Sequence, residues 1–297
     1  MKIAVCGKGG TAIRRNGRNM KISVASGKGG TGKTTIAVNL ALTLQDVQYI
    51  DCDVEEPNGH IFLKPRIEET LSVGIPVPQV DLSRCTYCGM CAKICEYHAI
   101  ITLSDNVLVF PELCHGCGGC SYICPADAIQ EVEREIGVIE KGKAESIEFV
   151  QARLNIGEPM APPLIRKEKS LINSQKKVII DSSPGTSCPV VTTVKGTDFC
   201  LLVTEPTPFG LNDLKLAVEM VRVLGISLGV VINLADIGTK DVWSYCEAEH
   251  IPILQEIPFD RKIAEAYSKG IPLIKEFPEY KEKFLKIYQK IMQRMVP

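Results

Sequence analysis

Hydrophobic residues occur in short runs that alternate with amphipathic stretches along most of the chain. Residues 20–26 form an apolar run that predicts a strand, and the pattern at Lys33–Leu44 predicts a helix after a glycine-rich turn. The same order returns after residue 170, with strands expected at 178–181, 199–204 and 229–235 and helices at 211–224 and 241–250. This alternation predicts an α/β fold with a doubly wound, mostly parallel sheet covered by helices on both faces.

The middle of the chain departs from this pattern. From about Val80 to Ile129 the sequence has few long apolar runs, frequent Pro and Gly, and eight cysteines, which predicts an inserted domain. Residues 130–170 predict a hairpin and a loop that return the chain to the sheet. The expected order is a first sheet part at 20–80, an insert at 81–131, a connecting hairpin and loop at 132–174, and a second sheet part at 175–297.

Residues 1–19 nearly repeat the segment that follows them. MKIAVCGKGGT resembles MKISVASGKGGT, but the first copy continues into AIRRNGRN and lacks the Lys-Thr pair of the second copy. This stretch has five Lys or Arg and no acidic residue. We interpret residues 1–19 as a degenerate basic extension and assign no function to them.

Composition and charge narrow the function classes. Of 297 residues, 45% are hydrophobic and 23% are charged, which is typical of globular proteins and excludes disordered, collagen-like and coiled-coil chains. The 34 basic and 35 acidic residues nearly cancel, so we expect no general binding to nucleic acid or to a membrane surface. No apolar run approaches the roughly eighteen residues of a membrane span, and no secretory signal is recognised at the N-terminus. We therefore expect a cytoplasmic protein.

A phosphate-binding motif follows the first predicted strand. Residues 27–35 are GKGGTGKTT and match G-x-x-x-x-G-K-S/T through Gly27, Gly32, Lys33 and Thr34. The backbone amides of such a loop face the phosphates, the lysine contacts the terminal phosphates and the hydroxyl ligates Mg²⁺. The same string matches the dinucleotide motif G-x-G-x-x-G, with acidic residues downstream about where a ribose acid would lie. We favour Mg²⁺-ATP, because a dinucleotide pyrophosphate gives Lys33 and Thr34 no function.

An additional lysine, Lys28, makes this loop more specific than the general phosphate-binding motif. KGGTGKTT resembles the deviant Walker A motif of the MinD/ParA/Mrp class of P-loop ATPases, to which the nitrogenase iron protein also belongs. The resemblance implies a homodimer in the ATP state, in which Lys28 crosses the interface to the nucleotide of the partner chain. A solvated loop charge is the alternative for Lys28. The implied nucleotide contacts are Gly27, Gly29, Gly30, Gly32, Lys33, Thr34 and Thr35.

Two later segments resemble the nucleotide-dependent switches of that class. In YIDCDVEEPN at 49–58, the resemblance implies that Asp53 positions the attacking water and that Asp51 supports the Mg²⁺ region. In VIIDSSPGT at 178–186, it implies that Asp181 holds Mg²⁺ through water. Any one of these acids could instead be a helix cap, but together they lie at predicted strand ends, where doubly wound folds bind ligands.

Two further segments resemble the family's adenine site. VVINLAD at 230–236 places Asn233 where the family contacts adenine. IPFDRKIAEAYSKGIPL at 257–273 resembles the closing segment beside the base, which includes Pro258 and Asp260. With these segments, the resemblance covers most of the chain outside the insert.

Eight of the thirteen cysteines form two runs with metal-ligand spacing. Each run has three cysteines separated by two residues and a fourth after three more, at Cys85, Cys88, Cys91 and Cys95 and at Cys114, Cys117, Cys120 and Cys124. This spacing is typical of proteins that hold two [4Fe–4S] clusters. A pair of zinc sites is the alternative, although zinc would need neither the third cysteine nor the longer last spacing in both runs.

The two runs resemble those of bacterial two-cluster ferredoxins, so the insert is expected to be a ferredoxin-like α+β domain. The resemblance implies crossed ligation, with one cluster on Cys85, Cys88, Cys91 and Cys124 and the other on Cys114, Cys117, Cys120 and Cys95. One departure is Glu96, which stands where a proline usually follows the first run. Cys188 follows the second switch, where the nitrogenase iron protein has a ligand for a shared cluster. A buried or incidental thiol is the favoured interpretation of Cys188.

Together these resemblances imply a MinD-type ATPase with an inserted ferredoxin domain. We expect a Mg²⁺-ATP-dependent dimeric switch whose nucleotide state gates electron transfer through two [4Fe–4S] clusters to or from a partner protein. The alternative is the assembly or transfer of iron–sulfur or related metal clusters to an acceptor protein, as in the Mrp relatives. A third hypothesis is a positioning switch with purely structural clusters.

Overall fold

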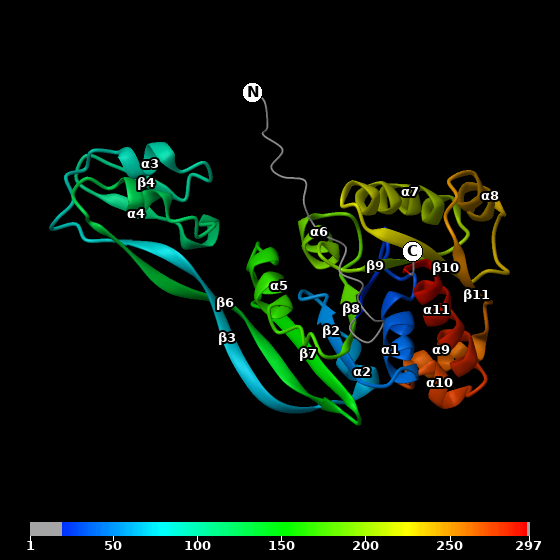
Figure 1. The fold of residues 1–297 in the computed structure, drawn as a ribbon. Helices are drawn as coiled ribbons and strands as arrows, with labels where there is room; N and C mark the ends of the chain where they lie inside the picture. The colour runs from blue at the N-terminus through cyan, green and yellow to red at the C-terminus, as the bar shows by residue number, and fades with distance from the viewer. Residues whose placement is uncertain (1–19, 296–297) are drawn as a thin grey trace.

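The computed structural model describes residues 20–295, so the predicted extension at 1–19 lies outside the described residues. Within that range, nine strands form one sheet in the order β11-β10-β9-β1-β8-β2-β7-β6-β3 (Figure 1). The strands are β1 (Lys21–Ala25), β2 (Val47–Cys52), β3 (Arg66–Val80), β6 (Ile129–Ala144), β7 (Ile147–Leu154), β8 (Lys177–Ser182), β9 (Phe199–Thr204), β10 (Ser227–Asn233) and β11 (Ile253–Ile257). The strands from β11 to β7 are parallel, whereas β6 and β3 pair antiparallel. The predicted α/β fold with a mostly parallel sheet is therefore confirmed.

Helices cover both faces of the parallel part of the sheet. On one face lie α1 (Lys33–Thr43), α2 (Gly59–Leu63), α9 (Arg261–Ser268), α10 (Leu273–Glu276) and α11 (Tyr280–Met295). On the other face lie α5 (Pro162–Lys169), α6 (Cys188–Val194), α7 (Pro208–Val223) and α8 (Asp241–Ala248). None of the helices within residues 20–295 is long and apolar enough to cross a membrane.

Strand β2 is buried at every position. Tyr49 packs in the cluster beneath α1 and α11, whereas the next residue, Ile50, packs in the cluster beneath α5. Successive side chains of a strand point to opposite faces, so a strand covered on both sides buries every position. The ring of Tyr49 also stacks on Phe149 of β7, with centroids 5.9 Å apart.

A long antiparallel ribbon formed by β3 and β6 extends from one edge of the sheet (Figure 1). Strand β3 runs in the same direction as the parallel strands, because it is antiparallel to β6 and β6 is antiparallel to β7. Its end at Val80 therefore projects toward the carboxyl edge of the sheet, which is also where the loop between β1 and α1 lies. The predicted insert at 81–131 is at the tip of this ribbon.

The segment at the tip is small and has its own short elements. They are α3 (Met90–Ile94), β4 (Ile100–Thr102), β5 (Val107–Val109), a 3₁₀ turn (Pro111–Leu113) and α4 (Gly119–Ile123). Strands β4 and β5 form a separate antiparallel pair. Five of the cysteines lie with Ile100, Val107 and Ile129 in one apolar cluster or against it, and α3 packs on α4.

The structure differs from the sequence prediction in the return segment. Residues 132–174 were predicted to contain a hairpin and a loop, and the hairpin of β6 and β7 is present, but the turn-rich stretch leads into α5. Prolines occupy the first positions of this helix, where a missing amide hydrogen removes no hydrogen bond. Proline also begins α7 earlier than predicted, with the Thr207 hydroxyl accepting a hydrogen bond from the Gly210 amide.

Candidate functional site

The glycine-rich loop connects β1 to α1 at the carboxyl edge of the sheet. Gly30 and Gly32 have φ of 79° and 91°, in the left-handed region that favours glycine. A Cβ atom on Gly32 would lie 2.7 Å from Nδ2 of Asn233, so the site has no room for a larger residue. Because α1 begins at Lys33, the positive end of the helix dipole faces the space beside this loop.

Three of the predicted nucleotide residues are buried next to one another. Lys33 and Thr34 are nearly buried at the start of α1, and Asp181 is fully buried at the end of β8. Burial raises the pKa of Asp181 to about 6, while a hydrogen bond from Thr34 and the charge of Lys33 oppose that shift. The Tyr49 hydroxyl donates to Oδ2 of Asp181 at 3.2 Å, and Oδ1 is buried without a hydrogen-bond partner among the described residues.

This unpartnered oxygen bears on the predicted magnesium. A buried carboxylate oxygen without a partner is costly, and Mg²⁺ with its water ligands would supply the missing interaction. The Thr34 hydroxyl lies beside the same carboxylate. The donor set of Thr34 and Asp181 therefore fits a hydrated Mg²⁺ ion.

The two acids of the first predicted switch have different surroundings. Asp51 lies directly opposite Asp181 in the ladder between β2 and β8, and both burial and the Asp181 charge raise its pKa well above the usual range. The Asp51 carboxylate accepts the amides of Asp53, Asn58 and Gly59 at 3.3, 3.1 and 2.8 Å, so it anchors the loop after β2.

Asp53 follows one residue beyond the end of β2. Burial raises its pKa to about 6, while the charge of Lys33 opposes that shift. The structure therefore brings Asp53 within electrostatic range of the predicted phosphate-binding lysine.

Lys28 forms an ion pair within its own chain. Its ammonium group contacts the carboxylate of Glu205, the residue after β9. Glu205 also accepts a hydrogen bond from the Thr207 hydroxyl at 3.2 Å. Lys28 is thus partly exposed and paired within its own chain, and its predicted role across a dimer interface requires it to leave Glu205. The sequence analysis missed Glu205, although an acid directly after an apolar strand at this edge is a usable signal.

The predicted adenine segments lie together, and some of their polar groups have structural partners. Nδ2 of Asn233 donates to the carbonyl oxygen of Thr31 at 3.0 Å and so connects β10 to the glycine-rich loop. The Asp260 carboxylate caps α9 by accepting the Lys262 amide at 2.8 Å. Pro258 is exposed beside it. A contact of these residues with a base stays a prediction.

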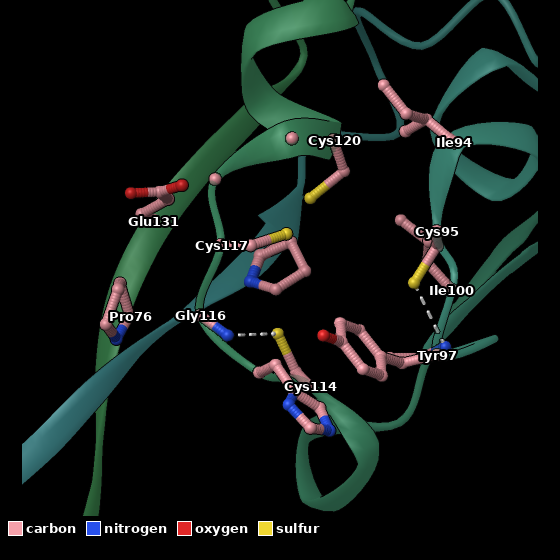
Figure 2. Close-up of a pocket in the computed structure, with 15 residues that line it drawn as sticks. Pro76, Ile94, Cys95, Tyr97, Ile100, Cys114, Gly116, Cys117, Cys120 and Glu131 are labelled. Carbon is pink, nitrogen blue, oxygen red and sulfur yellow. Dashed lines mark hydrogen bonds between the residues drawn. The ribbon is translucent and has the colours of Figure 1, made fainter. Parts of the chain in front are cut away.

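The cysteine-rich segment contains two hollows, each lined by four cysteines. The first hollow is lined by Cys95, Cys114, Cys117 and Cys120, whose side chains surround a common space in Figure 2. The second is lined by Cys85, Cys88, Cys91 and Cys124. Each hollow takes three cysteines from one run and the fourth from the other, which is the grouping that crossed ligation requires.

The backbone around the two runs is an internal repeat. Residues at matching offsets have positive φ, at Tyr87, Gly89 and His98 in the first run and at Gly116, Gly118 and Asp127 in the second. The first and fourth cysteines of each run accept backbone amides on sulfur at 3.3 or 3.4 Å, from Tyr87, Ala99, Gly116 and Ala128. Such N–H donors stabilise thiolate charge, so the repeat provides two equivalent sites for anionic sulfur.

Two features of the first hollow could not be predicted from spacing. The rings of Tyr97 and His115 stack with centroids 3.5 Å apart and join the two runs. Burial raises the pKa of the Cys120 thiol to about 11 and also raises that of Cys114. Within residues 20–295, no three His, Cys, Asp or Glu side chains are grouped closely enough to hold a single metal ion.

The remaining cysteines differ in exposure. Cys52, Cys200 and Cys246 are buried in the sheet and helix core, as small apolar side chains commonly are. Cys188 is exposed at the first turn of α6. Cys6 lies outside the described residues. Cys188 is therefore not a buried thiol, and of the favoured interpretation only an incidental thiol is left.

Comparison with known proteins places the nucleotide site in a family. Residues 22–273 match the profile described as the CobQ/CobB/MinD/ParA nucleotide binding domain, a span that includes the glycine-rich loop, both predicted switches and Asn233. The chain belongs to this MinD/ParA nucleotide-binding family. The predicted P-loop class is thereby confirmed, and the dinucleotide alternative is not supported.

Relatives and solved structures agree with this assignment. An uncharacterized protein of Methanocaldococcus jannaschii is 31% identical over 268 residues, which cover 86% of this chain and 92% of that protein. An iron–sulfur cluster carrier protein of the same organism is 25% identical over 93% of this chain and 84% of its own length. The septum site-determining protein MinD of Pyrococcus horikoshii, solved with Mg-ADP, has a TM-score of 0.57 at 20% identity over 92% of this chain and 95% of its own. The MinD likeness shows a shared fold.

Proposed function

We propose that this MinD/ParA-family protein is a Mg²⁺-ATP-dependent dimeric switch that gates electron transfer through two [4Fe–4S] clusters. The observation that carries the proposal is the pair of four-cysteine hollows at the tip of the β3–β6 ribbon. The ribbon projects toward the same edge of the sheet as the nucleotide loop. One molecule therefore carries a nucleotide site and two candidate redox sites on one side.

The nucleotide half of the proposal assigns roles to four side chains. Lys33 contacts the terminal phosphates, and Thr34 and Asp181 hold Mg²⁺, since one Asp181 oxygen is buried without a partner among the described residues. Asp53 orients the attacking water, and its burial next to the Lys33 charge supports that role. Closure of the loop after β2 onto a bound triphosphate would move Asp53 with the backbone that Asp51 anchors.

The redox half assigns the eight cysteines to two clusters, each held by three cysteines of one run and one of the other. When bound, such clusters accept and donate single electrons. The chain contributes thiolate ligands, and it contributes amide donors to sulfur at equivalent positions of both runs. The stacked Tyr97 and His115 rings lie against the first hollow and connect the two runs.

Lys28 is the residue that we propose to act across the dimer interface. In the single chain its charge is balanced by Glu205, so it is already held in position at the exposed surface of the loop beside Gly29 and Gly30. On dimerisation the ammonium group would exchange the Glu205 carboxylate for a phosphate of the partner's nucleotide. This exchange keeps the charge paired throughout, so it avoids leaving a partly buried cation without a counter-charge.

Paired cysteine variants test the redox assignment. Anaerobically purified Cys95→Ser should lose the cluster of the Cys114 run and keep the other, and Cys124→Ser should do the reverse. Iron content and low-temperature EPR of the reduced proteins measure this outcome. If Cys95→Ser instead removes the cluster of its own run, or if the wild-type protein holds zinc and no iron, the proposal is wrong.

Gating is tested by potentiometric titration with and without a non-hydrolysable ATP analogue. Nucleotide should shift at least one potential, and reduction should then change nucleotide affinity by the same free energy, on the order of 1–3 kcal/mol for an allosteric switch. Lys33→Ala is the control, because it should keep both clusters and lose the nucleotide-dependent shift. Identical potentials and identical affinities would contradict gating.

The names of several relatives favour a second candidate function, the delivery of clusters to an acceptor. Proteins named iron–sulfur cluster carriers match 93% of this chain at 25% identity. A carrier should pass iron to an apo-acceptor when nucleotide is added, whereas a redox relay should retain its iron through repeated oxidation and reduction. Radiolabelled iron followed through size-exclusion chromatography with an apo-ferredoxin acceptor distinguishes the two functions.

A further inference from the structure

Helix α5 lies between the ribbon and the nucleotide-binding part of the molecule. Leu164 and Ile165 of α5 are fully buried in one apolar cluster with Ile75 of β3 and Ile136 of β6. The ribbon passes so close to the helix that a Cβ atom on Gly137 would lie 2.8 Å from a methyl carbon of Leu164. The root of the ribbon and α5 are therefore packed as one unit, and neither can move without repacking the other.

The last turn of α5 contacts the strand that leads into the first predicted switch. Glu168 is fully buried, and its carboxyl group lies against the Cys52 thiol at the end of β2. The next residue along β2 is Asp53, the proposed water-orienting acid. Both carboxyl oxygens of Glu168 lack a hydrogen bond of normal geometry among the described residues. This contact is thus close but weakly held, so a displacement of the strand end costs few hydrogen bonds.

The next residue connects α5 to the helix that follows the second predicted switch. Nζ of Lys169 donates to the carbonyl oxygens of Thr192, Thr193 and Lys195 at 2.7, 2.5 and 2.7 Å. These carbonyls are at the carboxyl end of α6, where a cation is favoured by the helix dipole. All three ammonium hydrogens are used, so α5 and α6 are joined at one point by three charge-assisted hydrogen bonds.

Helix α6 in turn begins where the second predicted switch ends. Between Asp181 and Cys188 the chain passes through Gly185, whose φ is 96° and whose amide donates to the carbonyl oxygen of Ser26 beside the glycine-rich loop. A change in that loop therefore reaches α6 through a single short segment. Helix α5 is then in contact with the elements adjoining both predicted switches and with the root of the cysteine-bearing ribbon.

We infer that α5 transmits nucleotide-dependent movement of the switch segments to the ribbon, with Lys169 as the positioning residue that joins α5 to α6. The inference rests on the proposed function and adds the route by which one site acts on the other. A shift of α6 pulls α5 through Lys169, and α5 repacks against the ribbon root at Leu164. Because packed interfaces have discrete arrangements, a small shift can be amplified along the length of the ribbon.

Hydrogen exchange measured by mass spectrometry tests this route in the full-length protein. Binding of a non-hydrolysable ATP analogue should change the exchange of peptides from β3 and β6 in the wild-type protein. Lys169→Met should bind the analogue with unchanged affinity and lose the ribbon response, whereas a purely structural cap would lower the melting temperature and leave the response in place. Lys290→Met is the matched control, because it removes an ammonium-to-carbonyl hydrogen bond to Leu254 on the opposite face of the sheet.

Two results would overturn the inference. If the hydrogen exchange of the wild-type ribbon does not change when the analogue binds, transmission is excluded and the assignment of the nucleotide site is unaffected. If Lys169→Met shows the full change in exchange, a role of Lys169 in the transmission is excluded. If Lys169→Met does not fold, Lys169→Gln keeps two N–H donors at a shorter reach and is judged by the same criteria. Failure of the cysteines to hold clusters would contradict the redox proposal without changing this measurement, because the readout is backbone exchange.

Discussion

Replacing Glu168 by glutamine should change how stability depends on pH. The Glu168 carboxyl group is fully buried at the end of α5, and burial is the main cause that raises its pKa well above the usual range. The Asp51 charge raises the pKa further, while the Cys52 thiol, the Ala152 amide and the Lys169 charge oppose it. The fold therefore favours the protonated form of Glu168 more strongly than the unfolded chain does.

The sign and size of the effect follow from proton linkage. A raised pKa in the folded state stabilises the protein at low pH, and this contribution is lost as pH rises from the unfolded pKa toward the folded one. Each pH unit that lies between the unfolded and the folded pKa of Glu168 costs about 1.4 kcal/mol of stability for one proton. Glutamine keeps the shape of the side chain and cannot ionise. As pH rises through that window, the stability of Glu168→Gln relative to the wild type should therefore increase by that amount per pH unit.

Urea unfolding under anaerobic, reducing conditions measures the difference. Trp243 is the only tryptophan in the chain and lies in α8, so its fluorescence reports on the nucleotide-binding part and not on the cysteine-rich tip. Glu276→Gln, which changes an exposed carboxyl group in α10, is the matched control. A stability difference between Glu168→Gln and wild type that stays constant across the pH range would show that Glu168 is ionised in the fold, and the argument would fail.

Three further predictions concern the nucleotide site. Lys33→Ala should abolish tight ATP binding in a calorimetric titration and leave the iron content unchanged, because the charge of this lysine serves the phosphates; unaltered affinity would contradict the P-loop assignment. Asp53→Ala should bind ATP and hydrolyse it far more slowly in a phosphate-release assay, and a wild-type rate would make Asp53 a structural acid. Glu205→Gln should release Lys28 and so lower the protein concentration at which ATP drives dimerisation, whereas Lys28→Ala should raise that concentration. Analytical ultracentrifugation measures both. Equal behaviour of the two variants would exclude a role of Lys28 across the interface.

The sequence alone determined the class of fold and predicted the residues of the two candidate sites. The phosphate loop is local, because Gly27 to Thr35 form one turn between a strand and a helix, and that turn needs its glycines wherever it occurs. The cysteine spacing is local for three of the four cysteines around each hollow, whereas the fourth comes from the other run and is brought there by the fold. The α/β alternation follows from burial on both faces of the parallel part of the sheet, where the strands are short apolar runs.

Tertiary structure decided which distant groups meet. The partner of Lys28 is Glu205, and no sequence period connects the two, because adjacent positions at the carboxyl edge of a parallel sheet come from strands far apart in the chain. The length of β3 could not be predicted from the sequence, because a two-stranded ribbon away from the core is exposed at most positions. Such a strand lacks the apolar pattern of a buried strand. Helix α5 was missed for a related reason, since Glu168 in its charged last turn is buried and Lys169 is bound by carbonyl groups of α6, and only the fold supplies these surroundings.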